Sequence, residues 1–383
     1  MGGPAKPRSI AIAEPVIGEA EMAAVLEPLR SGWLTQGPKV AEFEGAFAAM
    51  HGVADAIAVT SCTTGLHLAL AALEIGPGDE VIVPAFTWVA TAAAVRYVGA
   101  DPVLCDVDPS TYNIDPEDLA KRITPRTRAV IPVHLFGLCA DMDALRAVLP
   151  DDVLVIEDAA CAAGATYRGR HAGGLGDVGV FSFHPRKSIT TGEGGMVTTD
   201  DGDLAARCRV LRNHGATISE EDRHRGPAPW RLPDFELLGF NFRMTDIQAA
   251  IGIVQLSRLQ GLIEERDRAA GVYREGLAGL PWLRTPVVPE GSRHGWQAFV
   301  TVVGEGAPMP RDEIMAALQE LGISTRPGTH AISELAYWRN LLELETGALE
   351  VSSMLERQTM ALPLHNRMSA DDYVYIIDAL HSL

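Results

Sequence analysis

The first half of the chain alternates short apolar runs with stretches of helical pattern, and no other feature limits the possible folds as strongly. The runs lie between Ala54 and about Thr199 and are four to six residues long. Short, nearly continuous apolar runs are typical of parallel strands buried on both faces. The pattern therefore predicts an α/β fold in which helices cover a mostly parallel sheet. The predicted strands are Ala56–Val59, Glu80–Val83, Pro102–Cys105, Ala129–Val133, Val153–Ile156 and Val178–Phe183.

The remaining chain predicts a second, smaller domain. A chain of 383 residues, of which 47% are hydrophobic, can bury a large core and is long enough for two domains. We expect a large domain over residues 1–255 and a smaller α+β domain over residues 256–383. The smaller one should contain a strand over Trp296–Val303 and a helix over Arg311–Leu321.

Two further segments lie close to this boundary. Residues 212–234 are polar, charged and rich in proline, which predicts a long loop of the kind that is usually functional or disordered. Thr245 to Gln248 has the form of a capping box. A helix should therefore begin there, run to about Arg268 and lead into the smaller domain.

Lys187 and Asp158 point most directly to chemistry. Lys187 follows a buried strand and precedes a glycine-rich turn, where a lysine is costly to desolvate unless it is paired or used covalently. Asp158 follows another strand, at the edge where open α/β sheets bind ligands. The pair suggests pyridoxal phosphate (PLP), because a lysine can hold its aldehyde and an acid can keep its ring nitrogen protonated. The alternatives are a lysine that reaches solvent and a helix-capping aspartate.

Other residues match the phosphate and the ring of that cofactor. Thr63 and Thr64 lie in a run of hydroxyl residues before a helical segment, and the N–H groups at a helix N-terminus bind phosphate. An ordinary helix cap is the alternative. Strand alternation can turn Ser182 toward the same site. Trp88 can stack on the pyridine ring, or can lie in the core as tryptophans commonly do.

Five motifs occur in an order that resembles the DegT/DnrJ/EryC1/StrS aminotransferases. The similarity runs from Gly32 to His365 and so covers nearly the whole chain. It implies a fold-type I PLP enzyme of a group that acts mostly on nucleotide-linked keto sugars. The motifs are Thr-Ser-Cys-Thr-Thr-Gly, Pro-Ala-Phe-Thr-Trp-Val-Ala, Glu-Asp-Ala-Ala, Phe-Ser-Phe followed by the lysine and Gly-Glu-Gly-Gly, and Gly-Phe-Asn-Phe-Arg-Met.

The resemblance assigns roles to individual residues. Lys187 and Asp158 are the catalytic residues, and no metal is implied. Asn241 is expected to reach the phosphate of the neighbouring subunit, which implies a homodimer with shared active sites. The cofactor-binding residues are Thr63, Thr64, Trp88, Asp158, Cys161, Ser182, Lys187 and Asn241. The candidates for substrate contact are His184, Arg243, Arg326 and His330, of which the two histidines could instead simply pack.

Three positions can be compared with the family pattern. Cys161 stands where the family usually has glutamine or histidine beside the ring oxygen, and a thiol is a weak donor, so that bond is weaker or another group such as water supplies it. Cys62 replaces a common glycine or alanine, which we expect to matter little because that loop works through its backbone. Lys187 is retained, which favours transamination over the dehydration of relatives that carry histidine there.

The predicted reaction is a transamination in amino-sugar biosynthesis. An amino acid, L-glutamate by the resemblance, donates its amino group to a keto sugar, for which a nucleotide-linked keto-deoxyhexose is the first candidate. Two alternatives remain open at this point. One is an aminotransferase that acts on a keto-cyclitol, and the other is a non-catalytic protein that binds a phosphate ligand on the same fold.

Composition narrows the partners and the compartment. The net charge of −18 argues against nucleic acid, whose binding depends on clustered lysine and arginine. Five cysteines without paired or metal-type spacing indicate a reducing compartment and no zinc site. Residues 1–6 lack the apolar core of a signal peptide, and no apolar run of about 18 residues could span a bilayer. We therefore expect a cytoplasmic enzyme without a membrane partner.

Overall fold

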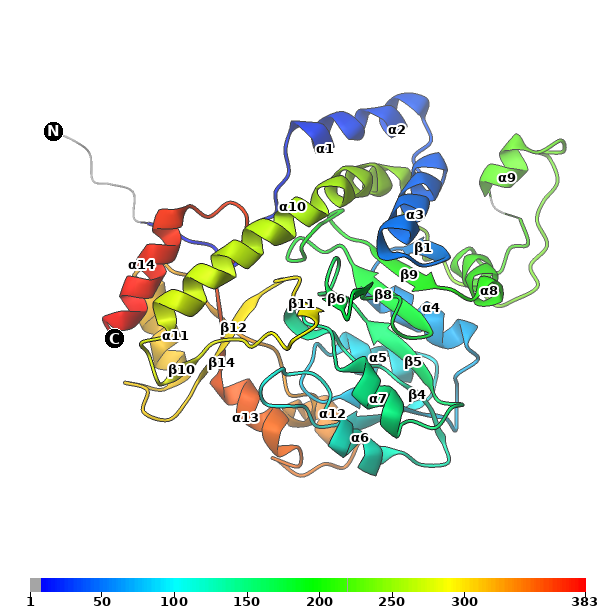
Figure 1. Ribbon diagram of the computed structural model, residues 1–383. Coiled ribbons are helices and arrows are strands. Elements are labelled where there is room, and N and C mark those ends of the chain that lie inside the picture. The colour runs from blue at the N-terminus through cyan, green and yellow to red at the C-terminus, as the bar shows by residue number, and fades with distance from the viewer. Residues whose placement is uncertain (1–7, 219) are drawn as a thin grey trace.

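A seven-stranded sheet forms the centre of the molecule (Figure 1). The computed structural model describes residues 8–218 and 220–383, so the amino-terminal residues considered above lie outside it. Six strands of the sheet run in one direction and β9 runs against them. The predicted mostly parallel α/β sheet is thus confirmed. Its strands, in spatial order, are β1 (Asp55–Val59), β9 (Gly195–Thr199), β8 (Val178–Ser182), β5 (Leu154–Asp158), β4 (Thr127–Val130), β2 (Glu80–Pro84) and β3 (Asp101–Cys105).

The sheet is buried on both faces because its strands carry apolar side chains on both sides. In β1, Ala56 and Ala58 pack into one hydrophobic cluster while Ile57 and Val59 pack into the other, as strand alternation requires. One cluster contains α3 (Pro38–His51), α6 (Pro116–Arg122), α7 (Met142–Val148) and the first half of α10 (Asp246–Leu277). The opposite cluster contains α4 (Cys62–Ala72), α5 (Ala90–Tyr97) and α8 (Gly202–Arg212).

A smaller antiparallel sheet lies beside the carboxyl-terminal half of α10 (Figure 1). Helices α11 (Arg311–Glu320) and α14 (Ala370–His381) share its core. Its strands, in order, are β10 (Leu283–Arg284), β12 (Phe299–Val303), β14 (Thr359–Leu362) and β13 (Arg326–Pro327). The remaining elements are α1 (Glu19–Ala24), α2 (Leu26–Ser31), η1 (Leu135–Gly137), β6 (Thr166–Tyr167), β7 (Arg170–His171), α9 (Glu220–Arg225), β11 (Ser292–Arg293), η2 (Ile332–Glu334), α12 (Ala336–Leu341) and α13 (Glu350–Gln358).

Helix α10 begins where the sequence predicts and ends later. Thr245 caps it by accepting from the N–H of Gln248, whose side chain accepts in turn from the N–H of Thr245. The helix continues to Leu277, nine residues beyond the expected Arg268. It also passes without a break through residue 255, so the proposed domain boundary falls inside a helix and stays a prediction.

The strand predicted over Trp296–Val303 is shorter in the structure. β12 begins only at Phe299, because Trp296 takes a left-handed backbone conformation with φ of 47°. Its ring is fully buried and stacks on His294 with 3.9 Å between ring centroids. The aromatic packing of Trp296 therefore delays the start of the strand by three residues, from the predicted Trp296 to Phe299, and its end at Val303 is as predicted.

The segment after α8 forms an arm that stands out from the body of the protein (Figure 1). It carries the short helix α9, so it is not the structureless loop that its composition predicts. Two isolated β-bridges close its base, between Asn213 and Asn241 and between Ala216 and Phe235. Over the described residues, no helix has the length and apolarity needed to cross a membrane.

Candidate active site

Four segments bring the predicted site residues to one edge of the central sheet. Asp158 ends β5 and Ser182 ends the neighbouring β8. β9 runs in the opposite direction, so its first residue, Gly195, pairs with Ser182 at the same edge. Helix α4 begins just after β1 ends at Val59, which pairs with the same Gly195. The site is therefore built where parallel strands end, the usual ligand edge of open α/β sheets.

A hydrogen-bonded turn holds Lys187 in place after β8. The Lys187 N–H donates to the carbonyl oxygen of His184 at 2.8 Å. The carbonyl oxygen of Phe183 accepts from both the N–H and the hydroxyl of the following threonines, Thr191 at 3.0 Å and Thr190 at 2.8 Å. Because these bonds use the hydroxyl-rich sequence of the turn itself, the lysine stands on a rigid support rather than on a mobile loop.

The Lys187 side chain points back over the end of β5. It is half-buried, and its Nζ lies 3.2 Å from Cys161 Sγ. Desolvation lowers the pKa of Lys187, but Cys161, Cys62 and Asp158 together raise it above the ordinary value. The amine is therefore held among acidic groups and does not extend into solvent, which excludes the alternative of a lysine that reaches the surface.

Asp158 is a buried carboxylate with three partners. Its Oδ2 accepts from the Thr91 hydroxyl at 2.7 Å, and its Oδ1 accepts from the Ala160 N–H at 3.2 Å. The Cys62 thiol lies 3.7 Å from Oδ1. Thr91 comes from the first turn of α5, three residues after Trp88, and no sequence pattern predicts this contact. The carboxylate does not cap helix α5, because its contact with that helix is the Thr91 hydroxyl and not a backbone N–H group.

Removing the Thr91 hydroxyl should destabilise the protein. Thr91 is 1% exposed, so Thr91→Val leaves one oxygen of a buried carboxylate without its donor. The expected cost is about 1–3 kcal/mol in the free energy of unfolding, measured by denaturant titration. Thr91→Ser keeps the hydroxyl and should lose less stability. Equal stability of Thr91→Val and the wild type would contradict the contact.

The start of α4 forms a donor-rich turn beside β9. Ser61 caps the helix, since its Oγ accepts from the Thr64 N–H at 3.1 Å. The Thr64 hydroxyl donates to the Ser61 carbonyl oxygen at 2.8 Å, so it would have to change partner in order to hold a phosphate. The N–H groups of Cys62 and Thr63 precede the helical hydrogen-bonding pattern and remain as donors. Thr63 itself is half-buried.

Glycine is needed where β9 passes this turn. A Cβ on Gly195 would lie 2.6 Å from the carbonyl carbon of Ser61 and 2.7 Å from the backbone nitrogen of Cys62. Both contacts are shorter than real Cβ atoms make, so any larger residue would push the strand and the helix start apart. Ser182 pairs with Gly195 and is buried, and its Oγ accepts from the His184 N–H at 3.4 Å. Its own hydroxyl proton is therefore free for another acceptor.

Cys62 is more than a neutral replacement for glycine. Its sulfur contacts Asp158 Oδ1, and it lies 3.8 Å from the carbonyl oxygen of Val180. Burial, followed by the nearby Asp158 charge, raises the pKa of the Cys62 thiol well above its ordinary value. The Cys62 side chain therefore borders Asp158, a contact that the sequence did not predict, and the expectation that this residue has little consequence stays a prediction.

Trp88 and His330 come together although they lie far apart in the sequence. Their ring centroids are 5.8 Å apart, and the Thr87 N–H donates to the His330 carbonyl oxygen at 3.1 Å. Trp88 is 61% exposed, so the alternative of a core tryptophan does not hold. His330 Nδ1 lies 3.6 Å from Glu356 Oε1. Arg326 is exposed on β13.

Two further segments carry the remaining candidate residues. One lies beside the end of β1 that precedes α4, and the other is the turn that holds Lys187. Arg243 forms a β-bridge with Val59, and its guanidinium donates to Asn213 Oδ1 at 2.8 Å. Asn241, two residues earlier, is exposed. The half-buried His184 accepts from the Arg186 N–H through Nδ1, and desolvation lowers the pKa of His184.

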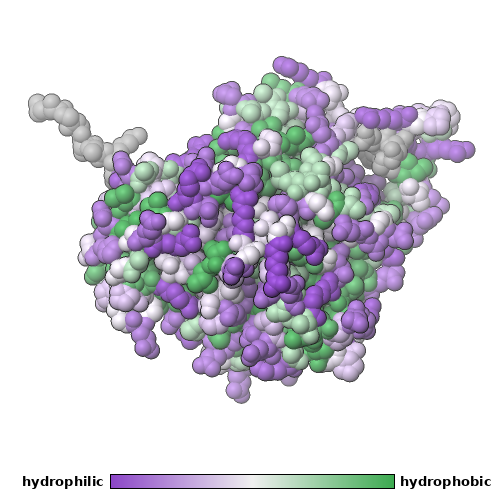
Figure 2. All heavy atoms as spheres, viewed as in Figure 1, coloured by the Kyte–Doolittle hydropathy of each residue, from purple (hydrophilic) through white to green (hydrophobic). Residues whose placement is uncertain are grey.

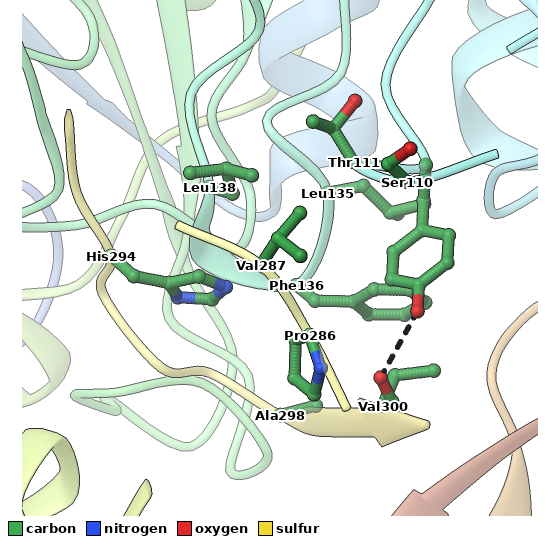
Figure 3. Close-up of a pocket in the computed structure, with 11 residues that line it drawn as sticks. Ser110, Thr111, Leu135, Phe136, Leu138, Pro286, Val287, His294, Ala298 and Val300 are labelled. Atoms are coloured by element: carbon green, nitrogen blue, oxygen red, sulfur yellow. Dashed lines mark hydrogen bonds between the residues drawn. The ribbon is translucent and has the colours of Figure 1, made fainter. Parts of the chain in front are cut away.

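A separate small pocket lies between η1 and β12 (Figure 3). The Tyr112 hydroxyl donates across it to the Val300 carbonyl oxygen, at 3.3 Å. Leu135, Phe136 and Val287 make most of the remaining wall apolar. None of the predicted site residues lines this pocket, and it has no charged group suited to a phosphate or a carboxylate.

The residues at the sheet edge fit a PLP molecule. They supply an amine at Lys187, a buried carboxylate at Asp158 and an exposed indole at Trp88. They also supply donors at the start of α4 and at Ser182, and Gly195 lets β9 pack directly against that helix start. These are the groups that an aldehyde, a pyridine nitrogen, an aromatic ring and a phosphate each require.

Comparison with known proteins identifies an enzyme family. The family model for the DegT/DnrJ/EryC1/StrS aminotransferase family matches residues 15–381. The GDP-perosamine synthase of Caulobacter vibrioides is 44% identical over 97% of both chains. The spore coat polysaccharide biosynthesis protein SpsC of Bacillus subtilis is 41% identical over 96% of this chain and 95% of its own.

Solved structures share the fold. Spr1654 of Streptococcus pneumoniae, described as a candidate sugar aminotransferase, superposes with a TM-score of 0.92 in its PMP form and 0.91 in its PLP form. It is 30% identical, and the match covers 98% of both chains. The predicted fold-type I architecture, aminotransferase class and PLP cofactor are thereby confirmed. The chain belongs to the DegT/DnrJ/EryC1/StrS aminotransferase family.

Proposed function

We propose that this PLP-dependent aminotransferase transfers an amino group from L-glutamate to a nucleotide-linked keto-deoxyhexose. The observation that carries the proposal is the convergence of Lys187, Asp158 and the start of α4 at one sheet edge. The name of the Caulobacter relative supports a GDP-linked sugar as the first substrate to test. The keto-cyclitol alternative stays open, whereas a non-catalytic binder does not agree with the aminotransferase family or with the retained lysine.

Lys187 has two tasks in this proposal. When bound, PLP supplies an aldehyde that combines with amines and a ring that withdraws electrons from the substrate carbon. Lys187 Nζ would hold that aldehyde and, when free, would serve as the base that moves the proton at the substrate Cα. The turn that fixes Lys187 keeps the amine over the end of β5 in both tasks, because it is bonded through its backbone and not through Nζ.

Asp158 holds the proton on the ring nitrogen. The Thr91 hydroxyl and the Ala160 N–H orient its carboxylate, which is 5% exposed and so acts at low dielectric. A fixed negative charge favours the protonated ring and thus the electron withdrawal on which the proton transfer at Cα depends.

The phosphate and ring contacts follow from the remaining residues. The N–H groups of Cys62 and Thr63, with the Thr63 and Ser182 hydroxyls, bind the phosphate, and Thr64 contributes chiefly by bracing the turn. The exposed indole of Trp88 would stack on the ring. Cys161 takes the position beside the ring oxygen, where its thiol is a weak donor.

Substrate contacts come from the rim of the same edge. The chain is acidic overall, so an anionic nucleotide needs a local set of cations and N–H groups. His184, Arg243, Arg326 and His330 are the candidates. Arg326 is exposed and could bind a phosphate group directly. Arg243 would first have to break its hydrogen bond to Asn213 Oδ1.

A substrate panel tests the proposal. Purified enzyme loaded with PLP is given L-glutamate and, in turn, GDP-, dTDP- and UDP-linked keto-deoxyhexoses and a free keto-cyclitol, and 2-oxoglutarate is measured. We expect the highest kcat/KM with a nucleotide-linked sugar. A keto-cyclitol as the best substrate would replace the proposed acceptor class, and no turnover with any acceptor would count against the reaction itself.

The proposal includes a homodimer with shared sites. The arm after α8 exposes large apolar side chains, with Trp230 at 77%, Leu232 at 83% and Leu238 at 95%. Helices α1 and α2 expose Met22 and Leu29, and Figure 2 shows green side chains over this part of the surface. A second copy of the chain would cover such residues, as is usual for symmetric enzymes. Asn241 lies at the base of the arm, within reach of a partner.

Mixing two inactive variants should restore activity if Asn241 serves the partner's site. Lys187→Ala removes the amine, and Asn241→Asp places a repelled carboxylate near the phosphate. Random exchange of equal amounts gives about half heterodimers, each with one intact site of two, so roughly a quarter of the wild-type activity should return. Subunit exchange is verified by native mass spectrometry. An inactive mixture after complete exchange would place Asn241 in its own subunit's site.

A further inference from the structure

One cysteine lies against the lysine on which the proposed reaction depends. Cys161 Sγ and Lys187 Nζ are 3.2 Å apart, close enough for a hydrogen bond and for reaction between the two atoms. The other four cysteines are buried, whereas Cys161 is half-buried and can be reached by a small solute. A thiol beside an amine at the mouth of a site is therefore a distinctive feature of this chain.

We propose that Cys161 and Lys187 form an oxidation-sensitive pair, in which peroxide joins Sγ to Nζ and so blocks the lysine. The reaction has two balanced steps. The thiol and one hydrogen peroxide give the sulfenic acid and water, so sulfur loses two electrons to the peroxide. Nζ then attacks sulfur, an S–N bond forms and the S–O bond breaks. The hydroxyl group of the sulfenic acid leaves with one proton from nitrogen as a second water.

The second step requires an unprotonated amine. Desolvation lowers the pKa of Lys187, whereas Cys161, Cys62 and Asp158 together raise it above the ordinary value. The 3.2 Å contact offsets the scarcity of the unprotonated form, because it holds the two reacting atoms together.

Cys62 is the nearby thiol that could compete with Lys187 for an oxidised Cys161, and it is poorly placed to react. Its thiol is buried and lies toward Asp158 and the Val180 carbonyl oxygen. Burial and the Asp158 charge raise its pKa, so the thiolate needed for disulfide formation is scarce. The amine of Lys187 is therefore the better partner for an oxidised Cys161.

The link should form only when Lys187 is free. When Nζ is bonded to the PLP aldehyde it cannot attack sulfur, so enzyme saturated with PLP alone should not form the link. Enzyme that has received an amino group from a donor has a free Lys187 and can form it. This state dependence rests on the proposed function, whereas the chemical pairing of the two side chains does not.

Mass spectrometry tests the pairing directly. Enzyme loaded with PLP is treated with hydrogen peroxide, with or without L-glutamate, then digested and analysed. We expect the Cys161 and Lys187 peptides to appear as one cross-linked species, lighter by two hydrogen atoms than their sum, and more abundant with glutamate. Excess dithiothreitol should release them. Activity should fall in proportion to the linked fraction and return with the thiol.

Matched variants keep the result interpretable. Cys161→Ser and Cys161→Ala should give no cross-link, and both are checked for folding by circular dichroism. Cys208→Ala removes a buried cysteine on α8, away from the site, and should leave the cross-link unchanged. A Cys62–Cys161 disulfide, over-oxidation of Cys161 alone, or no change at Cys161 would each overturn the proposal. A cross-link in enzyme that aminates no keto sugar would instead count against the proposed function only.

Discussion

Lys187→Ala should abolish transamination while the fold and the binding of PLP persist. The amine acts both as the group that holds the aldehyde and as the base at Cα. Its removal should therefore lower kcat by more than the factor of about 10²–10⁴ that positioned acid–base catalysis alone provides. Binding persists because Asp158, Ser182 and the start of α4 lie on other elements than the Lys187 turn.

Three measurements separate these effects. Turnover is followed with the best acceptor from the substrate panel, PLP binding by fluorescence titration, and covalent attachment by borohydride reduction and mass spectrometry. Arg186→Ala is the matched control, because Arg186 is exposed in the same turn and uses its backbone for the bonds to His184 and Gln297. The control should keep activity and covalent attachment. Normal turnover by Lys187→Ala would remove the lysine from the mechanism.

The strands that carry the site could be predicted because their sequences are locally unambiguous. Runs such as Val178–Phe183 are apolar on both faces and end at polar or glycine-rich turns, so their type and their ends follow from short-range pattern. Once the sheet is known to be parallel, Asp158 and Ser182 must share its carboxyl edge. That is why the cofactor could be inferred from residues at the ends of separate strands.

Contacts between distant segments could not be predicted in this way. Thr91 supports Asp158 across 67 residues, and Cys62 reaches the same carboxylate across 96. Neither residue carries a local signal, because a threonine in a first helical turn is ordinary and a buried cysteine is usually inert. The approach of His330 to Trp88 likewise depends on how the smaller sheet sits beside the larger one.

The neighbourhood of Cys161 shows what family resemblance adds and what it leaves out. The resemblance identified Cys161 as a departure beside the ring oxygen, but it gave no indication that Lys187 Nζ would lie 3.2 Å from the sulfur. That distance depends on side-chain directions at the ends of two strands. A substitution that suggests a weakened hydrogen bond in the sequence places a thiol against the lysine amine in the structure.

Asp158→Asn should keep the fold and lose most of the catalytic rate. The amide still accepts through its oxygen from the Ala160 N–H. Its NH₂ group can donate to Thr91, whose hydroxyl can turn its proton to the Trp88 carbonyl oxygen at 3.3 Å. Every buried polar group therefore keeps a partner, and we expect a change of less than about 1 kcal/mol in the free energy of unfolding.

The rate falls because an amide has no charge with which to hold a proton on the ring nitrogen. Loss of one preorganised electrostatic contact in such a site lowers kcat by about 10²–10³. The KM for the sugar should change little, since the side-chain contacts of Asp158 are with Thr91, Ala160 and Cys62 rather than with the rim residues proposed to bind substrate. Steady-state kinetics of Asp158→Asn, with Thr91→Ser as a control that keeps the carboxylate, separates the two parameters. A large rise in KM with an unchanged kcat would show that Asp158 serves binding, because a charge used only in the proton transfer must appear in kcat.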